Sequence, residues 1–400
     1  MADASITAQG LRKSALRYLS LAAALILIGV GVDFFIQHHQ GFSVRDVRFK
    51  GVDGTTFSAL VYKPRTATPD TPAPGILAVH GYINTRETQS AFAIEFARRG
   101  YVVVALDQRG HGYRGGAATT KGFGGPGGLT FLRSLPFVNK DEIGLEGHSM
   151  GGWTILAAAA AMPDAYKAMV LEGSSTGKPF AAPGTPTWPR NLALVYSRYD
   201  EFAPLMWGAP TASAVGSTAK LKALFGADAT VAPARLYGDI ASGTGRILHQ
   251  PTATHPGDHI SKVAVGEAAD CFARTLHGGT PRLASDQVWW WKEAGTGLFL
   301  AGIGALILGL FDLLLSLRGF TGLRAAPVAQ ATHRGGRWWA RWLTLTLIPP
   351  VTFFLLPISV SPLKPSGLFP QAITNWLIVW AVVNVLIGLA GGALIGGRTP

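Results

Sequence analysis

The run Gly147-His148-Ser149-Met150-Gly151-Gly152 lies between residues 142–146, which look like a short buried strand, and a strong helix former, 153–160. A G-x-S-x-G motif between a strand and a helix is typical of a tight turn that forces its serine into a strained backbone conformation. Small residues at positions 147 and 151 would let strand and helix pass closely. The strain would lift the Ser149 hydroxyl out of the sheet, and the free amides at the helix start could bind a developing oxyanion. The motif alone is common, so its context decides its meaning.

That context is an alternation of strand-like and helix-like runs between residues 44 and 277, which predicts a mostly parallel sheet with helices on both faces. The expected strands are 44–50, 57–62, 75–79, 101–106, 142–146, 168–172, 191–196 and 246–250, and the expected helices are 88–99, 128–135, 150–162, 211–225 and 262–276. Residues 115–128 are predicted to be a glycine-rich loop. Residues 174–190 are predicted to be a short excursion over the sheet, and residues 278–286 a flexible linker.

Four motifs follow predicted strands, namely the third, fourth, fifth and seventh. They are His80-Gly81-Tyr82, Asp107-Gln108-Arg109-Gly110-His111-Gly112, the serine motif itself, and Tyr199-Asp200-Glu201-Phe202-Ala203-Pro204. The order of these motifs resembles that of the α/β-hydrolase superfamily. Their sequences are most similar to its esterase and peptidase-like branches. The resemblance implies an α/β-hydrolase fold with a mostly parallel, eight-stranded sheet within residues 41–280.

A serine hydroxyl needs a base to take its proton, and in such folds the chain order is serine, acid, histidine. Asp200 is the leading acid because it follows the apolar run 192–196, and the adjacent Glu201 should then point elsewhere. The base is His255 or His259. Related hydrolases leave several residues between the histidine and the final helix, which favours His255 and keeps His259 as the alternative.

The resemblance also implies two oxyanion donors, the backbone amides of Met150 and Tyr82. His80 is expected to hold its own loop through hydrogen bonds, and Asp107 and Arg109 to brace loops through an ion pair. His111 and His148 could line the pocket, although satisfied polar neighbours are the favoured interpretation. No H-E-x-x-H run and no Cys/His cluster indicates zinc, so neither a metal nor a cofactor is expected.

The two ends of the chain differ from the middle in composition. Mean hydropathy is +0.26 and charged residues make up only 14 %. Apolar segments at 16–36, 295–317, 342–361 and 373–396 could each span a bilayer, which takes ~20 residues. The third is the weakest, because Pro349, Pro350 and Pro357 would kink it. We expect an N-terminal tail and uncleaved anchor in residues 1–40, and about three further membrane helices in residues 281–400.

Basic residues predict the orientation of these helices. Arg12, Lys13 and Arg17 precede the first segment, and Arg318, Arg324, Arg334, Arg337 and Arg341 fall between the second and third. This distribution predicts a cytoplasmic N-terminus in a bacterial inner or cell membrane, with residues 40–290 outside and the C-terminus inside. The net charge of +12 partly reflects the same bias. The middle domain has no basic stripe interleaved with aromatics, so nucleic acid is not expected as a partner.

Together these features predict a membrane-anchored serine hydrolase that cleaves an ester, or an amide, through an acyl-enzyme. Its partners would be the lipid bilayer and a small-molecule ester, acyl or short peptide substrate. Two alternatives stay open, a peptidase acting on short peptides and a catalytically idle hydrolase fold that serves as a membrane sensing or assembly module. The sequence defines neither the natural substrate nor the oligomeric state.

Overall fold

The computed structural model describes residues 7–51, 54–113, 120–324, 335–356, 362–364, 366, 368–369 and 371–395. The chain forms two compact units. The first consists of Gln37–Trp289 and Ser361–Ile378, and the second of Met1–Ile36, Trp290–Val360 and Val379–Pro400. Part of the predicted glycine-rich loop (115–119) and the residues Arg334 and Pro357 of the predicted membrane region lie outside the described residues.

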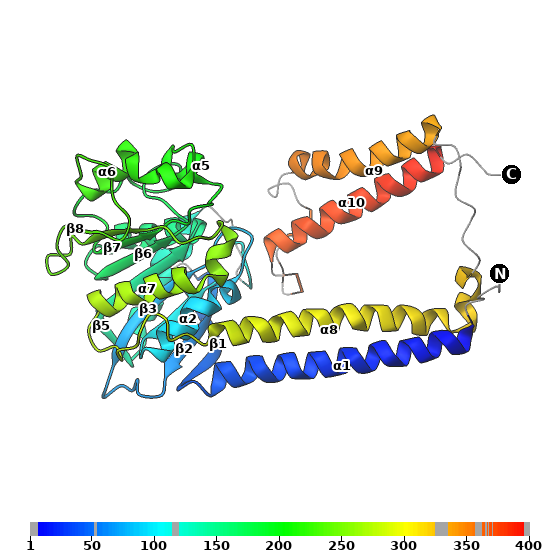
Figure 1. The fold of residues 1–400 in the computed structure, drawn as a ribbon, viewed down its shortest axis with the longest axis horizontal. Helices are drawn as coiled ribbons and strands as arrows, with labels where there is room; N and C mark the ends of the chain where they lie inside the picture. The colour runs from blue at the N-terminus through cyan, green and yellow to red at the C-terminus, as the bar shows by residue number, and fades with distance from the viewer. Residues whose placement is uncertain are drawn as a thin grey trace. The chain divides into compact units, whose positions relative to one another are not determined.

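The first unit is built on one sheet with the order β1-β2-β4-β3-β5-β6-β7-β9-β8 (Figure 1). Its strands are β1 (Phe42–Lys50), β2 (Thr56–Pro64), β3 (Ala73–Val79), β4 (Val102–Leu106), β5 (Val138–His148), β6 (Ala168–Glu172), β7 (Leu192–Val195), β8 (Leu236–Tyr237) and β9 (Arg246–His249). Strands β4, β3, β5, β6, β7 and β9 are parallel, and the others pair antiparallel. The mostly parallel sheet is confirmed. It has nine strands and not eight, because β8 is only two residues long and too short to leave a pattern.

Helices cover both faces of the sheet, as the alternating pattern predicted. Helices α2 (Ser90–Arg98) and α7 (Lys262–Thr275) lie on one face, and α3 (Gly125–Ser134) and α4 (Met150–Ala161) on the other. Two successive residues of β5 face different helix layers. A side chain on Gly144 would collide with Phe272 of α7, whereas Leu145 belongs to the apolar cluster beneath α4. Successive residues of a strand point to opposite faces.

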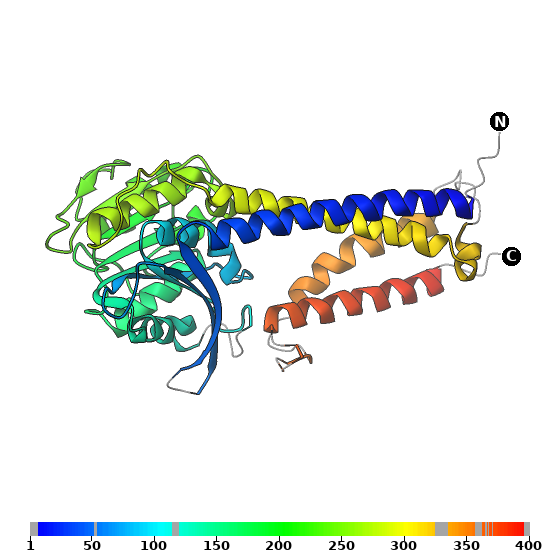
Figure 2. The ribbon, with the colours of Figure 1, turned by 90° about the horizontal axis from the view of Figure 1, so that it is seen from below.

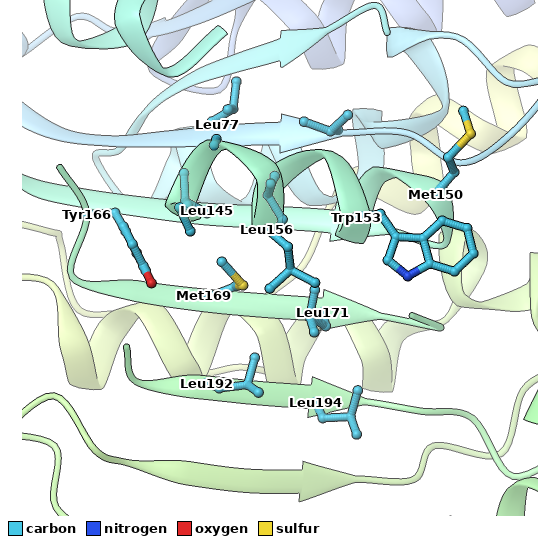
Figure 3. Close-up of a cluster of buried hydrophobic side chains, with 14 of the residues drawn as sticks. Leu77, Leu145, Met150, Trp153, Leu156, Tyr166, Met169, Leu171, Leu192 and Leu194 are labelled. Carbon is cyan, nitrogen blue, oxygen red and sulfur yellow. The ribbon is translucent and has the colours of Figure 1, made fainter. Parts of the chain in front are cut away.

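The core between α4 and the sheet is apolar and closely packed. Leu145, Leu156, Met169 and Leu171 lie where α4 packs on the strands in Figure 3, with Leu194 beside them on β7, and each is at most 1 % exposed. Fully burying one such side chain contributes ~1.5–3 kcal/mol. This packing fixes α4 on the sheet, and with it the turn that precedes α4.

Short helical segments follow β7 and precede β8. They are α5 (Ala203–Trp207), the 3₁₀ turn η3 (Ala212–Ser217) and α6 (Ala219–Phe225). The helix expected at 211–225 is therefore broken in two. Thr218 causes the break, because its backbone is extended and its hydroxyl accepts a hydrogen bond from the Leu221 N–H, which starts a new helix.

The segment expected to be a flexible linker is bound to α2. Arg99 donates to the carbonyl oxygens of Leu283 (2.7 Å) and Asp286 (3.1 Å), and Arg98 makes an ion pair with Asp286 at 2.9 Å. The Thr280 N–H donates to the Arg99 carbonyl oxygen. The composition of this stretch suggested a linker, but the two arginines at the end of α2 hold its backbone in place.

Among the described helices, three are long and apolar enough to cross a membrane. They are α1 (Ala8–His38), α8 (Trp289–Leu315) and α10 (Ala372–Ile395, apolar over Ala372–Gly391). Four segments were expected, and the third of them, 342–361, lies partly outside the described residues. The third segment forms α9 (Gly336–Leu355), whose first turns carry the polar and aromatic residues up to Trp342. Its apolar part, 343–355, would extend only ~20 Å at 1.5 Å per residue, less than a bilayer core.

Helices α1 and α8 run side by side in both views (Figures 1 and 2). Glycines make the approach close. A methyl group on Gly29 would lie 2.6 Å from the Gly295 carbonyl oxygen, and one on Gly302 would lie 2.7 Å from the Ile26 side chain. Small residues at such contacts let two backbones pack closely, which drives helix association in lipid.

Candidate active site

Ser149 occupies the turn between β5 and α4, and its backbone has φ 54° and ψ −119°. A positive φ is strained for a residue with a side chain, so the surroundings must hold it. The Ser149 N–H donates to the Glu172 carbonyl oxygen (2.8 Å), and Ser174 Oγ donates to the Ser149 carbonyl oxygen (2.7 Å). Both backbone groups of Ser149 are thus tied to the end of the neighbouring strand β6.

Two glycines make this turn sterically possible. A methyl group on Gly147 would overlap the Gly151 carbonyl oxygen, and one on Gly151 would overlap the Val79 carbonyl oxygen of β3. Only a hydrogen side chain allows such an approach. The prediction that small residues at 147 and 151 let strand and helix pass closely is confirmed.

His255 and Asp200 form a buried pair. The distance from His255 Nδ1 to Asp200 Oδ2 is 2.7 Å, and the two residues are 8 % and 4 % exposed. Asp200 Oδ1 accepts the Phe202 N–H at 2.8 Å, and the Phe202 ring lies edge-on to the His255 ring at 4.5 Å. A carboxylate at Nδ1 makes that nitrogen the donor, so Nε2 of the neutral imidazole is free to accept a proton.

Glu201 was expected to point away from the site, and its carboxylate does not replace that of Asp200. Glu201 Oε2 instead accepts the backbone N–H of His255 at 3.2 Å. The two adjacent acids therefore have different roles. Asp200 contacts the imidazole, and Glu201 holds the loop that carries it.

The residue after β6 links this pair to the serine turn. A methyl group on Gly173 would lie 2.9 Å from His255 Nδ1 and 3.2 Å from Asp200 Oδ2, and Gly173 itself has a positive φ of 49°. Its two neighbours in the chain are the residues that bond the Ser149 backbone. The His148 ring, directly before Ser149, lies 4.7 Å from the His255 ring, and His148 Nε2 donates to the His255 carbonyl oxygen at 2.9 Å. The fold therefore brings Ser149, Asp200 and His255 together.

The alternative base, His259, lies behind this group. Its ring is 4.1 Å from the His148 ring, and the carboxylate of Asp200 is bonded to His255. Burial lowers the pKa of His259 to about 4. A base that stays neutral to so low a pH accepts a proton weakly. The low pKa of His259 and the hydrogen bond from His255 to Asp200 both favour His255 as the base.

The segments that carry the two expected oxyanion donors both adjoin Ser149. Met150 begins α4, so its N–H has no acceptor within the helix. A methyl group on Gly81 would lie 3.2 Å from Ser149 Cβ, which places the loop of Tyr82 against the serine. His80 Nδ1 donates to the Gly81 carbonyl oxygen (2.7 Å), while its Nε2 accepts the Gln108 N–H (3.1 Å). His80 thus holds its own loop, and burial lowers its pKa to about 3.

Asp107 braces the next loop, but with a different arginine from the one expected. Its carboxylate accepts the backbone N–H groups of Arg86 (3.0 Å) and Tyr113 (3.1 Å) and lies 3.7 Å from Arg86 Nε. Arg109 donates to Thr55 Oγ1 at 3.4 Å. The expected pairing of Asp107 with Arg109 was wrong because Arg86, distant in sequence, fills the position beside the carboxylate. The histidine of this motif, His111, bonds the Arg109 carbonyl oxygen, so it has a satisfied polar neighbour.

Three buried acids lie beneath the site, and sequence reasoning missed them. Glu146 and Glu172 are on β5 and β6, and Asp258 follows His255, all fully buried. Burial raises the pKa of Glu146 to about 8, with Gln89 Nε2 donating to both its carboxyl oxygens. Burial, reinforced by neighbouring acids, also raises the pKa of Glu172 and of Asp258. A signal was present in the sequence for Glu172, which ends the otherwise apolar strand β6.

The histidines and acids near the site are not arranged to hold a metal. Within the described ranges, no group of three or more His, Cys, Asp or Glu side chains has the geometry of an ion site. What the arrangement offers is a strained serine, an imidazole with a free nitrogen and two amides beside them. Covalent acyl transfer uses groups of these kinds.

The order of serine, acid and histidine along the chain is the order of the α/β-hydrolase fold. The serine follows β5, the acid follows β7 and the histidine follows β9, all at the carboxyl edge of one parallel sheet. The sequence model described as serine aminopeptidase, S33, matches residues 70–200. The chain has the α/β-hydrolase fold.

Similar proteins cover parts of this hydrolase-fold chain. A 130-residue stretch is 34 % identical to the monoacylglycerol lipase of Mycolicibacterium smegmatis, which is 31 % of this chain and 45 % of that protein. The chain thus spans less than half the length of this curated relative. Among solved structures, an esterase of Pyrococcus furiosus is 15 % identical over 60 % of this chain and 93 % of its own, with a TM-score of 0.43. A hypothetical protein of Pseudomonas aeruginosa is 26 % identical over 33 % of this chain and 42 % of its own, with a TM-score of 0.30.

Proposed function

We propose that this protein is a membrane-anchored serine hydrolase with the triad Ser149, His255 and Asp200. The observation that carries the proposal is the buried hydrogen bond of 2.7 Å between His255 Nδ1 and Asp200 Oδ2, beside a serine held at positive φ. An idle fold used only for sensing or assembly would have no need for a strained serine next to an oriented imidazole, since such strain costs ~1–3 kcal/mol.

The proposed reaction has two halves. In the first, Ser149 Oγ attacks the substrate carbonyl carbon while His255 Nε2 takes the hydroxyl proton, and the new oxyanion receives hydrogen bonds from the Met150 and Tyr82 amides. The tetrahedral intermediate then expels the alcohol or amine, which takes the proton from His255. In the second half, water attacks the acyl-enzyme by the same route and releases the acid. Asp200 stabilises the imidazolium that forms in each half.

An ester is the favoured substrate. The curated relative is named a monoacylglycerol lipase, which supports a carboxylic ester of a small alcohol. A peptidase acting on short peptides is the second candidate, because the family model that matches residues 70–200 is described as a serine aminopeptidase. Both reactions use the same triad, so pocket shape decides between them.

We further propose that residues 1–40 form a tail and anchor, 41–280 the hydrolase domain and 281–400 a membrane region. Three long apolar helices support membrane association. Arg12, Lys13 and Arg17 before the first of them, with Arg318 and Arg324 after the second, support a cytoplasmic N-terminus and an extracytoplasmic hydrolase domain in a bacterial cell membrane.

A substrate screen with the purified full chain tests the function. Esters of rising acyl length would be compared with aminoacyl amides, for the wild-type protein and for Ser149→Ala. We expect ester hydrolysis to exceed amide hydrolysis, and Ser149→Ala to lose both. Faster cleavage of the amides would establish the peptidase, and equal turnover by Ser149→Ala would reject the triad.

A further inference from the structure

Several large apolar side chains around the candidate site are exposed. Tyr82 and Ile83 follow β3, Tyr199, Phe202 and Leu205 follow β7, and Ile260 follows β9, and each is 40 % exposed or more. These six residues are called the apolar rim below. They come from three segments that are far apart in sequence but follow strands that end at the same edge of the sheet. Their exposure is therefore a property of that edge.

Contacts place the apolar rim around the catalytic group. Phe202 packs edge-on against the His255 ring, and the loop of Tyr82 and Ile83 begins at Gly81, which lies against Ser149. Ile260 follows His259, whose ring is 4.1 Å from that of His148. The rim therefore surrounds the place where a substrate would reach Ser149.

Ile83 shows that this exposure is maintained against two costs. Its φ is 57°, a region that β-branched residues rarely adopt, and its side chain is 63 % exposed. Asparagine or glycine would occupy the same conformation with less strain, and any polar side chain would be better solvated. A strained residue at a site is evidence that its side chain has a use there.

Exposed apolar groups gathered at one place mark a surface that meets a membrane, a partner or a ligand. The chain itself indicates which of these applies, because the part that the structure describes includes three helices long and apolar enough to cross a bilayer. Only residues 39–41 separate α1 from β1, so a domain tethered by a membrane-spanning α1 stays beside lipid.

We propose that the apolar rim binds the acyl region of a lipid surface, so that the substrate is a lipid-phase ester drawn from a bilayer or micelle. This inference rests on the proposed function and adds the substrate class. A soluble short-chain ester would reach Ser149 without the rim, whereas an ester packed in lipid would need the rim to replace the apolar contacts that it leaves behind.

The test compares two substrates on the full-length protein in detergent. One is a water-soluble acetate ester, and the other is a long-chain monoester dispersed in phosphatidylcholine vesicles. The variant is Ile83→Ser/Leu205→Ser/Ile260→Ser, three exposed positions outside the proposed catalytic machinery. The matched control is Leu236→Ser, which removes an exposed leucine from the edge strand β8.

We expect the triple variant to keep acetate hydrolysis within about twofold and to lose vesicle hydrolysis by at least about tenfold, mainly through a higher KM. Leu236→Ser should match the wild type on both substrates. Unchanged vesicle hydrolysis by the triple variant would overturn the proposal, and so would an equal loss on both substrates. A wild-type protein inactive on the acetate ester would instead reject the proposed function.

Discussion

The serine turn and the α1–α8 helix pair both depend on glycines that allow close backbone approach, but the consequences differ. In the turn, Gly147 and Gly151 bring α4 onto β5 and β3, and the residue between them is aimed in one direction by two backbone hydrogen bonds. In the helix pair, Gly29 and Gly302 set the distance between two helices, and Thr296 Oγ1 of α8 donates to Asp33 Oδ2 of α1 at 3.2 Å. In the turn, close backbone approach together with the two backbone hydrogen bonds orients a reactive side chain. In the helix pair, close approach brings two helices together.

The largest expected difference concerns the two histidines behind the turn. His255→Ala should reduce kcat by about four orders of magnitude or more, because it removes the group that takes the serine proton. His259→Ala should cost far less, since no bond joins it to Asp200. Steady-state hydrolysis of a soluble ester measures both. The reverse ranking would assign the base to His259.

A second difference concerns the glycines themselves. Gly151→Ala should destabilise the hydrolase domain by several kcal/mol, about 3 or more, because a methyl group there overlaps the Val79 backbone. Gly304→Ala in α8 is the matched control, since a methyl group there meets nothing within 4 Å. Thermal unfolding followed by circular dichroism should separate the two. Equal melting temperatures would show that the turn can relax.

The buried acids beneath the turn should give the domain a pH dependence. The pKa of Glu146 rises from 4.5 to about 8 on folding, so the folded state keeps a proton that the unfolded chain releases. Its contribution is fully present below pH 4.5 and is lost as pH rises to about 8. Glu146→Gln keeps the shape without the titration. Unfolding by denaturant between pH 5 and 8 should therefore show a flatter profile for Glu146→Gln than for the wild type, and parallel profiles would contradict the burial effect.

The smallest expected effect is in the helix pair. Gly29→Leu should weaken α1–α8 packing by about 1–3 kcal/mol, as overpacking usually does. Hydrolysis of a soluble ester should stay unchanged, because nothing in this pair aims a catalytic group. Thermal stability in detergent reports the first effect and an ester assay the second. Unchanged stability would mean that the two helices separate without cost at this position.

Features of the fold and of the candidate site could be predicted from the sequence where they depend on residues close together in the chain. The turn at Ser149 and the strands around it were predictable, because glycine spacing and apolar runs act over a few residues. The partner of Asp107 was not, because Arg86 reaches it through the fold and not along the chain. The close contacts of Gly29 and Gly302 were likewise invisible, since hydropathy shows that a helix is apolar but not which face meets a neighbour. The end of α9 was not predictable for a related reason. The apolar window at 342–361 did not show that its helix ends at Leu355.

The most direct test of the proposed triad is covalent labelling of the full-length protein with a fluorophosphonate, followed by mass spectrometry of its peptides. Such a probe reacts only with a serine whose hydroxyl is activated by a neighbouring base. We predict one adduct, on Ser149, that disappears in Ser149→Ala and is strongly reduced in His255→Ala. Labelling of another serine, or no labelling of a folded wild-type protein, would contradict the account.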